Sequence, residues 1–227
     1  MDRLHCSNCE IKSRAVETLD NKELEFLNKN CAEVTLSKGE HIIKEGTLSS
    51  HVAYIKSGLA KVHMMGPSGK DQILRLTPPG FYIGIQTILF DKVHRYSATA
   101  LMESRICYID IYSFKELIRR NHQFAYELIL YLCQNEMTYY DRFVNQFQKH
   151  LNGRLADAMI YFANTVSQDD KFELPLSRSD LGALIGATRE SVSRAIHELI
   201  NIGVIEMEGK MIKILNFEML NKISKSG

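Results

Sequence analysis

The sequence contains no apolar run near the ~18 residues that a membrane-spanning helix needs, and its longest candidate, residues 128–133, is far too short. Residues 1–6 lack the apolar stretch of a secretory signal. Neither sign of charge dominates, because 28 Lys and Arg residues and 27 Asp and Glu residues give a formal net charge of +1. No strong overall field therefore draws the chain to nucleic acid or membrane. We expect a cytoplasmic protein with no membrane partner.

Recognisable catalytic motifs are also absent. The sequence shows no Ser/His/Asp arrangement, no glycine-rich phosphate loop and no His-x-x-x-His pair, so we expect no enzyme. Five cysteines are an odd number in a chain that is neither small nor secreted, which favours free thiols or ligands over a disulfide framework. The 227 residues, 45% of them hydrophobic, suffice for one large or two modest domains.

Short β-branched segments between glycines and prolines mark the first half of the chain. We predict strands at residues 52–56, 59–64, 72–76 and 104–109, with a turn at 66–69. Many short strands at this spacing indicate a sandwich or a barrel.

A long helix is predicted before residue 152, because residues 85–152 contain neither glycine nor proline. Apolar residues recur there in steps of four and three, the spacing of a helix that supercoils with a partner. This seam could pack on its own domain, but its regularity over nearly four heptads favours a homodimer. The seam comprises Tyr126, Leu130, Cys133, Met137, Tyr140, Val144, Phe147 and Leu151.

The C-terminal third has the signals of a winged helix-turn-helix. A hinge is expected at residues 153–156 and a helix at 155–166, followed by a polar loop at 167–171. Ser177 and Asp180 have capping-box spacing and predict a helix that ends at Gly186. Thr188 can cap a second helix over 189–201, and residues 204–207 and 211–215 flank a hairpin turn. Two short helices and a hairpin in this order form a winged helix-turn-helix.

The second short helix carries the residue types that read DNA. Exposed residues near its start, Arg189, Glu190, Ser193 and Arg194, can enter the major groove, where Arg pairs with guanine and Glu with cytosine. We expect a preference for G·C-containing steps. The alternative is a solvated face with helical salt bridges, and residues 178–213 have a formal charge of zero, so the hypothesis depends on motif geometry. The predicted phosphate contacts are Ser177, Arg178, Thr188 and Lys210.

Residues 176–196, LSRSDLGALIGATRESVSRAI, closely resemble the DNA-binding motif of the cyclic AMP receptor protein and FNR (CRP/FNR) family of bacterial transcription regulators. The resemblance extends over nearly the whole chain. It implies an α+β fold with an N-terminal double-stranded β-helix, a jelly roll like that of cyclic-nucleotide-binding domains, as sensor (1–120). A dimerisation helix and hinge (121–152) and a C-terminal winged helix-turn-helix (153–227) follow. It further implies a homodimer on near-palindromic double-stranded DNA and contact with RNA polymerase. The competing hypothesis is a β-roll regulatory subunit that controls a protein partner without binding DNA.

The resemblance also defines the candidate effector pocket, at Gly84, Ile85, Arg95 and Ser97. Cyclic-nucleotide-binding relatives use a Gly-Glu pair for the ribose and an Arg-Ser or Arg-Thr pair for the phosphate. Here isoleucine follows Gly84, and an unpaired buried ribose hydroxyl would cost about 1–3 kcal/mol. We therefore expect cyclic AMP not to bind, and the effector remains unidentified.

The other sensing route in this family is an iron–sulfur cluster on four cysteines. Cys6, Cys9 and Cys107 match positions of the FNR ligand set, but Ala15 stands where the remaining cysteine is expected. His5 is a conceivable substitute, and Cys31 is expected in the core of the first strand. The sequence alone leaves a metal cofactor open.

Overall fold

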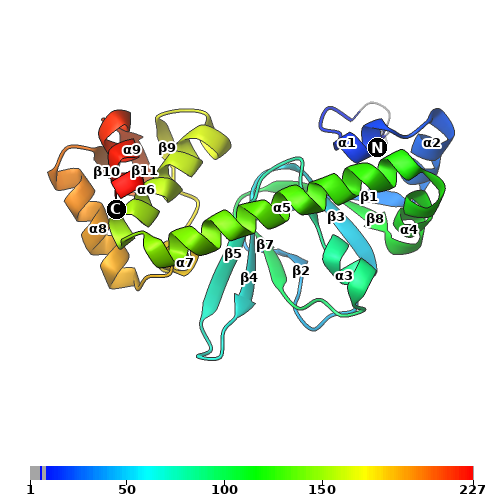
Figure 1. The fold of residues 1–227 in the computed structure, drawn as a ribbon, viewed down its shortest axis with the longest axis horizontal. Coiled ribbons are helices and arrows are strands. Elements are labelled where there is room, and N and C mark those ends of the chain that lie inside the picture. The colour runs from blue at the N-terminus through cyan, green and yellow to red at the C-terminus, as the bar shows by residue number, and fades with distance from the viewer. Residues whose placement is uncertain (1–5, 7–8, 227) are drawn as a thin grey trace. The chain divides into compact units, whose positions relative to one another are not determined.

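The computed structural model describes residue 6 and residues 9–226, and Figure 1 shows their course. The chain forms two compact units, which are described separately. The first comprises the chain up to residue 64 together with 75–137, and the second comprises 65–74 together with the chain from 138 onward. None of the described helices is both long and apolar enough to cross a membrane.

Two four-stranded sheets lie largely in the first unit, as the predicted strands required, although residues 65–74, which include parts of two of the strands, belong to the second unit. One sheet has the order β1 (Cys31–Leu36), β8 (Ser104–Asp110), β3 (His51–Ser57) and β6 (Tyr82–Ile83). The other has the order β2 (His41–Ile43), β7 (Ser97–Ala100), β4 (Ala60–Met65) and β5 (Asp71–Thr77). A glycine is required between β3 and β4, because Gly58 has φ +91° and a Cβ there would lie 2.5 Å from the Glu103 carbonyl oxygen.

Four helices accompany these sheets: α1 (Arg14–Glu17), α2 (Asn21–Lys29), α3 (Ile85–Phe90) and α4 (Ile111–Arg120). An aromatic chain forms the core beneath them. The ring centroids of Tyr54 and Tyr82 are 4.7 Å apart, those of Tyr82 and Phe114 5.9 Å, and those of Phe114 and Phe124 5.6 Å. Such ring pairs add to the burial of apolar area that stabilises this unit.

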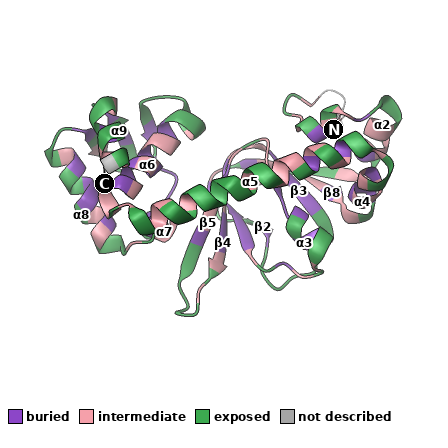
Figure 2. Ribbon diagram, viewed as in Figure 1, coloured by how far each residue is buried: buried purple, intermediate pink, exposed green. Residues whose placement is uncertain are grey.

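Helix α5 (His122–Gln148) is the long helix that the seam predicts. Phe124 and Leu128 near its start are buried, whereas the apolar side chains of its later turns are largely exposed (Figure 2). The helix ends earlier than predicted. Leu151, the last predicted seam residue, begins the separate helix α6, which His150 precedes as N-cap. The continuous seam therefore stops at Phe147.

The second unit contains α6 (Leu151–Tyr161), a π-helical turn η2 (Phe162–Ser167), β9 (Lys171–Glu173), α7 (Arg178–Ile185), α8 (Arg189–Asn201), β10 (Ile205–Glu208), β11 (Met211–Ile214) and α9 (Phe217–Ser226). Its sheet has the order β10-β11-β9. The expected hinge at residues 153–156 is wrong, because Gly153 is buried inside α6. The predicted polar loop is confirmed at residues 168–170, which are exposed bends, although residue 167 ends η2. Residue 171 begins β9, which pairs with β11 and buries Phe172.

Candidate functional site

Local hydrogen bonds set the two helices of the helix-turn-helix. The Ser177 hydroxyl caps α7 by accepting from the Asp180 N–H at 3.0 Å, and it donates to the Asp180 carboxylate at 2.6 Å. The Thr188 hydroxyl caps α8 by accepting from the Ser191 N–H at 3.2 Å. Both caps satisfy donors that a helix start leaves unpaired. The predicted starts of both helices are confirmed.

The turn between these helices depends on two glycines. Gly186 ends α7 with φ +67°, a left-handed conformation that favours glycine. The Ala187 N–H donates to the Gly182 carbonyl at 2.9 Å, and a Cβ at Gly182 would lie 2.5 Å from the Ala187 carbonyl oxygen. The missing side chain at Gly182 therefore lets the turn approach α7.

One face of α8 is buried and its opposite face is free. Val192, Ile196 and Leu199 are at most 1% exposed. Arg189 and Arg194 are both exposed, together with Glu190 in the first turn. Among the described contacts, Arg194 donates to the Ser191 hydroxyl at 3.4 Å and forms no ion pair with Glu190. The guanidinium groups and the carboxylate thus point away from the core, as base reading requires.

The remaining predicted DNA-contacting residues differ in their solvent exposure and in the contacts that their side chains already make. The half-buried Ser193 donates its hydroxyl to the Arg189 carbonyl at 3.1 Å and so turns toward its own helix. Arg178 is half-buried: its Nη2 lies 2.9 Å from the Met207 sulfur, and desolvation lowers the pKa of its guanidinium. Lys210 is exposed beside the hairpin turn. Lys210 is therefore freer to meet a phosphate than Arg178.

The predicted effector residues do not share one environment. Ile85 is 1% exposed and belongs to the core, and the buried Ser97 hydroxyl accepts from the Glu45 N–H at 3.0 Å. Arg95 has a 72% exposed side chain that pairs with Asp91 at 2.8 Å. The Gly84 N–H donates to the Tyr96 hydroxyl at 3.1 Å. In this structure, the Arg95 guanidinium is thus held at the surface by its ion pair with Asp91.

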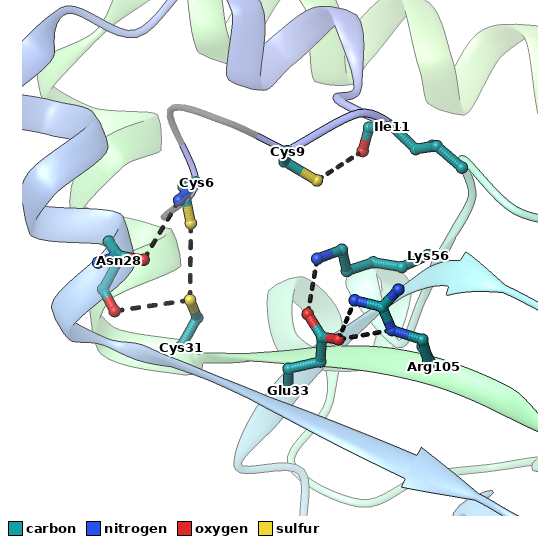
Figure 3. Close-up of polar contacts among 8 residues, drawn as sticks. All are labelled: Cys6, Cys9, Ile11, Asn28, Cys31, Glu33, Lys56 and Arg105. Carbon is teal, nitrogen blue, oxygen red and sulfur yellow. Dashed lines mark hydrogen bonds and ion pairs between the residues drawn. The ribbon is translucent and has the colours of Figure 1, made fainter. Parts of the chain in front are cut away.

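A cavity of about 520 Å³ in the first unit is lined by four of the cysteines. Cys6, Cys9 and Cys107 line it, and so does Cys31, which begins β1 and packs half-buried against the core, as expected. The Cys6 and Cys31 sulfur atoms are 3.7 Å apart (Figure 3). The hydrogen bond with Cys31 and then burial raise the pKa of Cys6, and a hydrogen bond with Cys107 is the main cause that raises the pKa of Cys31 to about 12. Cys31 and Glu33 are two residues apart on β1, so their side chains share one face of the sheet, and both line the cavity. This spacing was the signal in the sequence that could have placed Cys31 at the cavity. His5, the substitute considered from the sequence, lies outside the described residues.

Comparison with known proteins supports both units. A family model described as a Crp-like helix-turn-helix domain matches residues 153–223, and a cyclic nucleotide-binding domain model matches residues 33–121. The chain is 27% identical to electron transport regulator A of Shewanella oneidensis and 26% identical to the fumarate and nitrate reduction regulatory protein of Escherichia coli K12. Each alignment covers 97% of this chain and 90% of the relative.

Solved structures share the fold. FixK2 from Bradyrhizobium japonicum superposes with a TM-score of 0.77 at 23% identity, over 85% of this chain and 96% of that one. A transcriptional regulator from Eubacterium rectale gives a TM-score of 0.78 at 13% identity, over 92% and 96%. A β-roll unit and a winged helix with an exposed recognition helix define a DNA-binding transcription regulator. Within that class, the chain belongs to the CRP/FNR family.

Proposed function

We propose that two copies of this chain bind one near-palindromic DNA site, with the α8 helix of each copy in a major groove. The observation that carries the proposal is the outward placement of Arg189 and Arg194, without an ion pair among the described residues, at the capped start of a helix whose other face is buried. The half-sites would lie about one helical turn, or ~34 Å, apart. Arg189, Glu190 and Arg194 would read base edges, and Lys210 would meet a phosphate.

The exposed side of α5 supports the dimer. Large apolar side chains there would be unfavourable in water unless a partner covers them, and they follow the coiled-coil spacing. Met137 is 59% exposed and Phe147 is 74% exposed. Sequence analysis missed Ile129, Tyr139 and Phe143, which are exposed on the same helix. A second copy is the occupant that a self-complementary seam fits.

The three segments predicted from the sequence keep their roles in this proposal. The β-roll (1–120) senses a signal other than cyclic AMP, the helix region (121–152) dimerises, and the remainder (153–227) binds DNA. A signal that shifts the α5 seam would change the spacing of the two α8 helices, which couples sensing to DNA binding. We place the protein in the cytoplasm, acting with RNA polymerase and without catalytic activity of its own.

Selection of DNA from a random pool tests the proposal. The wild-type protein should enrich two inverted half-sites that contain G·C steps. Arg194→Ala should weaken binding by ~1–3 kcal/mol and relax the preference at one base pair in each half-site. Arg119→Ala is the matched control, because Arg119 is an exposed arginine on α4 of the first unit. If no sequence is enriched, the proposal fails and a β-roll regulatory subunit gains support.

A further inference from the structure

One arginine of α5 takes main-chain carbonyls from two other parts of the second unit. Arg142 is half-buried, and its Nη2 donates to the Ile73 carbonyl at 2.8 Å and to the Leu184 carbonyl at 2.7 Å. Its Nη1 donates to the Leu74 carbonyl. Ile73 and Leu74 belong to β5, and Leu184 belongs to α7, the first helix of the helix-turn-helix. One guanidinium therefore joins three segments that are far apart in the chain.

The carbonyls at the end of α7 need such partners. The last four carbonyls of a helix have no partner within it, and a cation near them is favoured by the helix dipole. The Ala183 carbonyl accepts from the Gln72 side-chain amide, and the Leu184 carbonyl accepts from Arg142. Side chains from outside the helix-turn-helix thus cap the end of α7.

The environment of Arg142 requires an arginine. Among the described residues its hydrogen-bond partners are carbonyl oxygens and include no carboxylate, and burial lowers the pKa of its guanidinium. These oxygens replace water around a charge that is costly to bury without partners. A guanidinium presents five donors in a planar fork, whereas a lysine presents its donors from one atom. Lysine would keep the charge but could not bridge β5 and α7 in the same way.

Other contacts hold the last turn of α5. A Cβ at Gly186 would overlap the Gln146 side-chain amide, so this amide lies against the turn of the helix-turn-helix. The Arg154 Nη1 of α6 donates to the Gln146 carbonyl at 2.6 Å. Arg142 lies six residues before the end of α5, which is ~9 Å along a helix. Two separated attachments fix an orientation that a single junction would leave free to turn.

We propose that Arg142 is a positioning residue that fixes the helix-turn-helix against the last turns of α5 and against residues 71–74 of β5. The inference rests on the proposed function, because Tyr140, Val144 and Phe147 of the dimer seam lie on the same turns of α5. Holding α7 against these turns sets the distance between the two α8 helices of a dimer. Arg142 therefore matters for a paired DNA site and little for a single half-site.

Strand β5 connects these contacts to the β-roll. Its residues 71–74 belong to the second unit and its residues 75–77 to the first. In the first unit, the Arg75 Nη2 donates to the Tyr82 carbonyl at 3.1 Å, close in sequence to the candidate effector pocket. A signal that moves β5 would withdraw its two carbonyls from Arg142. The position of the helix-turn-helix would then respond to the β-roll through this strand.

Binding of the full chain to duplexes with two half-sites and with one half-site tests this inference. Arg142→Lys should weaken binding to the paired site by ~10-fold or more. It should change binding to the single half-site by no more than about twofold, because α7 and α8 keep their own caps. Asp141→Asn is the matched control, since Asp141 is exposed on the same helix, and it should lower neither affinity.

Hydrogen exchange without DNA gives a second readout. Arg142→Lys should speed exchange in residues 71–74 and 183–187 together, because the loss of one guanidinium releases both segments. Gln72→Ala should act in the same direction, and the two changes combined should be less than additive. Equal weakening on both duplexes, tighter binding to the paired site, or faster exchange in only one segment would each overturn the proposal. If the wild type binds neither duplex, the proposed function fails, and the exchange pattern still decides whether Arg142 joins β5 to α7.

Discussion

Truncation of Phe147 is the sharpest test of the dimer seam. The side chain is 74% exposed in the single chain, and its ring centroid lies 4.8 Å from that of Phe143. Burial of a phenylalanine contributes about 1.5–3 kcal/mol, so Phe147→Ala should cost about 2 kcal/mol in each copy. Both copies change in a two-fold dimer, which gives about 4 kcal/mol. The dimer Kd should therefore rise roughly a thousandfold.

Sedimentation over a dilution series measures this change. Phe90→Ala is the matched control, since Phe90 is 85% exposed but lies on α3, away from the seam. The monomer should lose little stability in either variant, because surface substitutions usually change the free energy of unfolding by about 0.5 kcal/mol or less. A monomeric wild type at micromolar concentration, or equal Kd shifts for the two variants, would refute the reasoning.

Three further predictions concern other parts of the molecule. Gly182→Ala should weaken specific DNA binding at least tenfold and lower the unfolding temperature of the second unit, because its Cβ would lie 2.5 Å from the Ala187 oxygen. Calorimetry measures the unfolding temperature, and Gly66→Ala is the control because the nearest contact of its Cβ would be at 3.4 Å. Lys210→Ala should weaken binding to all DNA sequences alike and reduce the slope of log binding constant against log salt concentration by about 1. DNA titrations at several salt concentrations measure this slope, and Lys225→Ala is the control that should leave it unchanged. Burial lowers the pKa of His94 below its ordinary 6.5, so the unfolded state takes up a proton first as the pH falls. The free energy of unfolding should therefore decrease as the pH falls below about 6.5, and it should decrease less steeply in His94→Gln than in the control His197→Gln. Denaturant titrations at several pH values measure this dependence, and an equal dependence on pH in the two variants would count against His94.

Local signals were sufficient for the helix-turn-helix, its hairpin, the long helix and four strands of the first half, but not for α1–α4, α9 and the short strands β2, β6, β7 and β9. The capping residues Ser177 and Thr188 begin α7 and α8 where predicted, because a cap bonds to backbone groups only three residues away. Leu151 shows the limit of periodicity. It continues the seam in sequence but begins α6, since periodicity carries no information on where the backbone leaves a helix. Local signals also did not show that the Arg178 guanidinium contacts Met207, because these two residues are far apart in the chain.

The sequence by itself determined the order of the strand-rich half, the long helix and the helix-turn-helix, together with the recognition helix and its exposed arginines, because these depend on spacing along one segment. Only the tertiary structure decided that Cys31 belongs with Cys6, Cys9 and Cys107 at one cavity. Residues 31 and 107 are far apart in the chain, and the register of β1 against β8 alone makes them diagonal neighbours. Strand register follows from the packing of both faces of a sheet, which no single segment encodes.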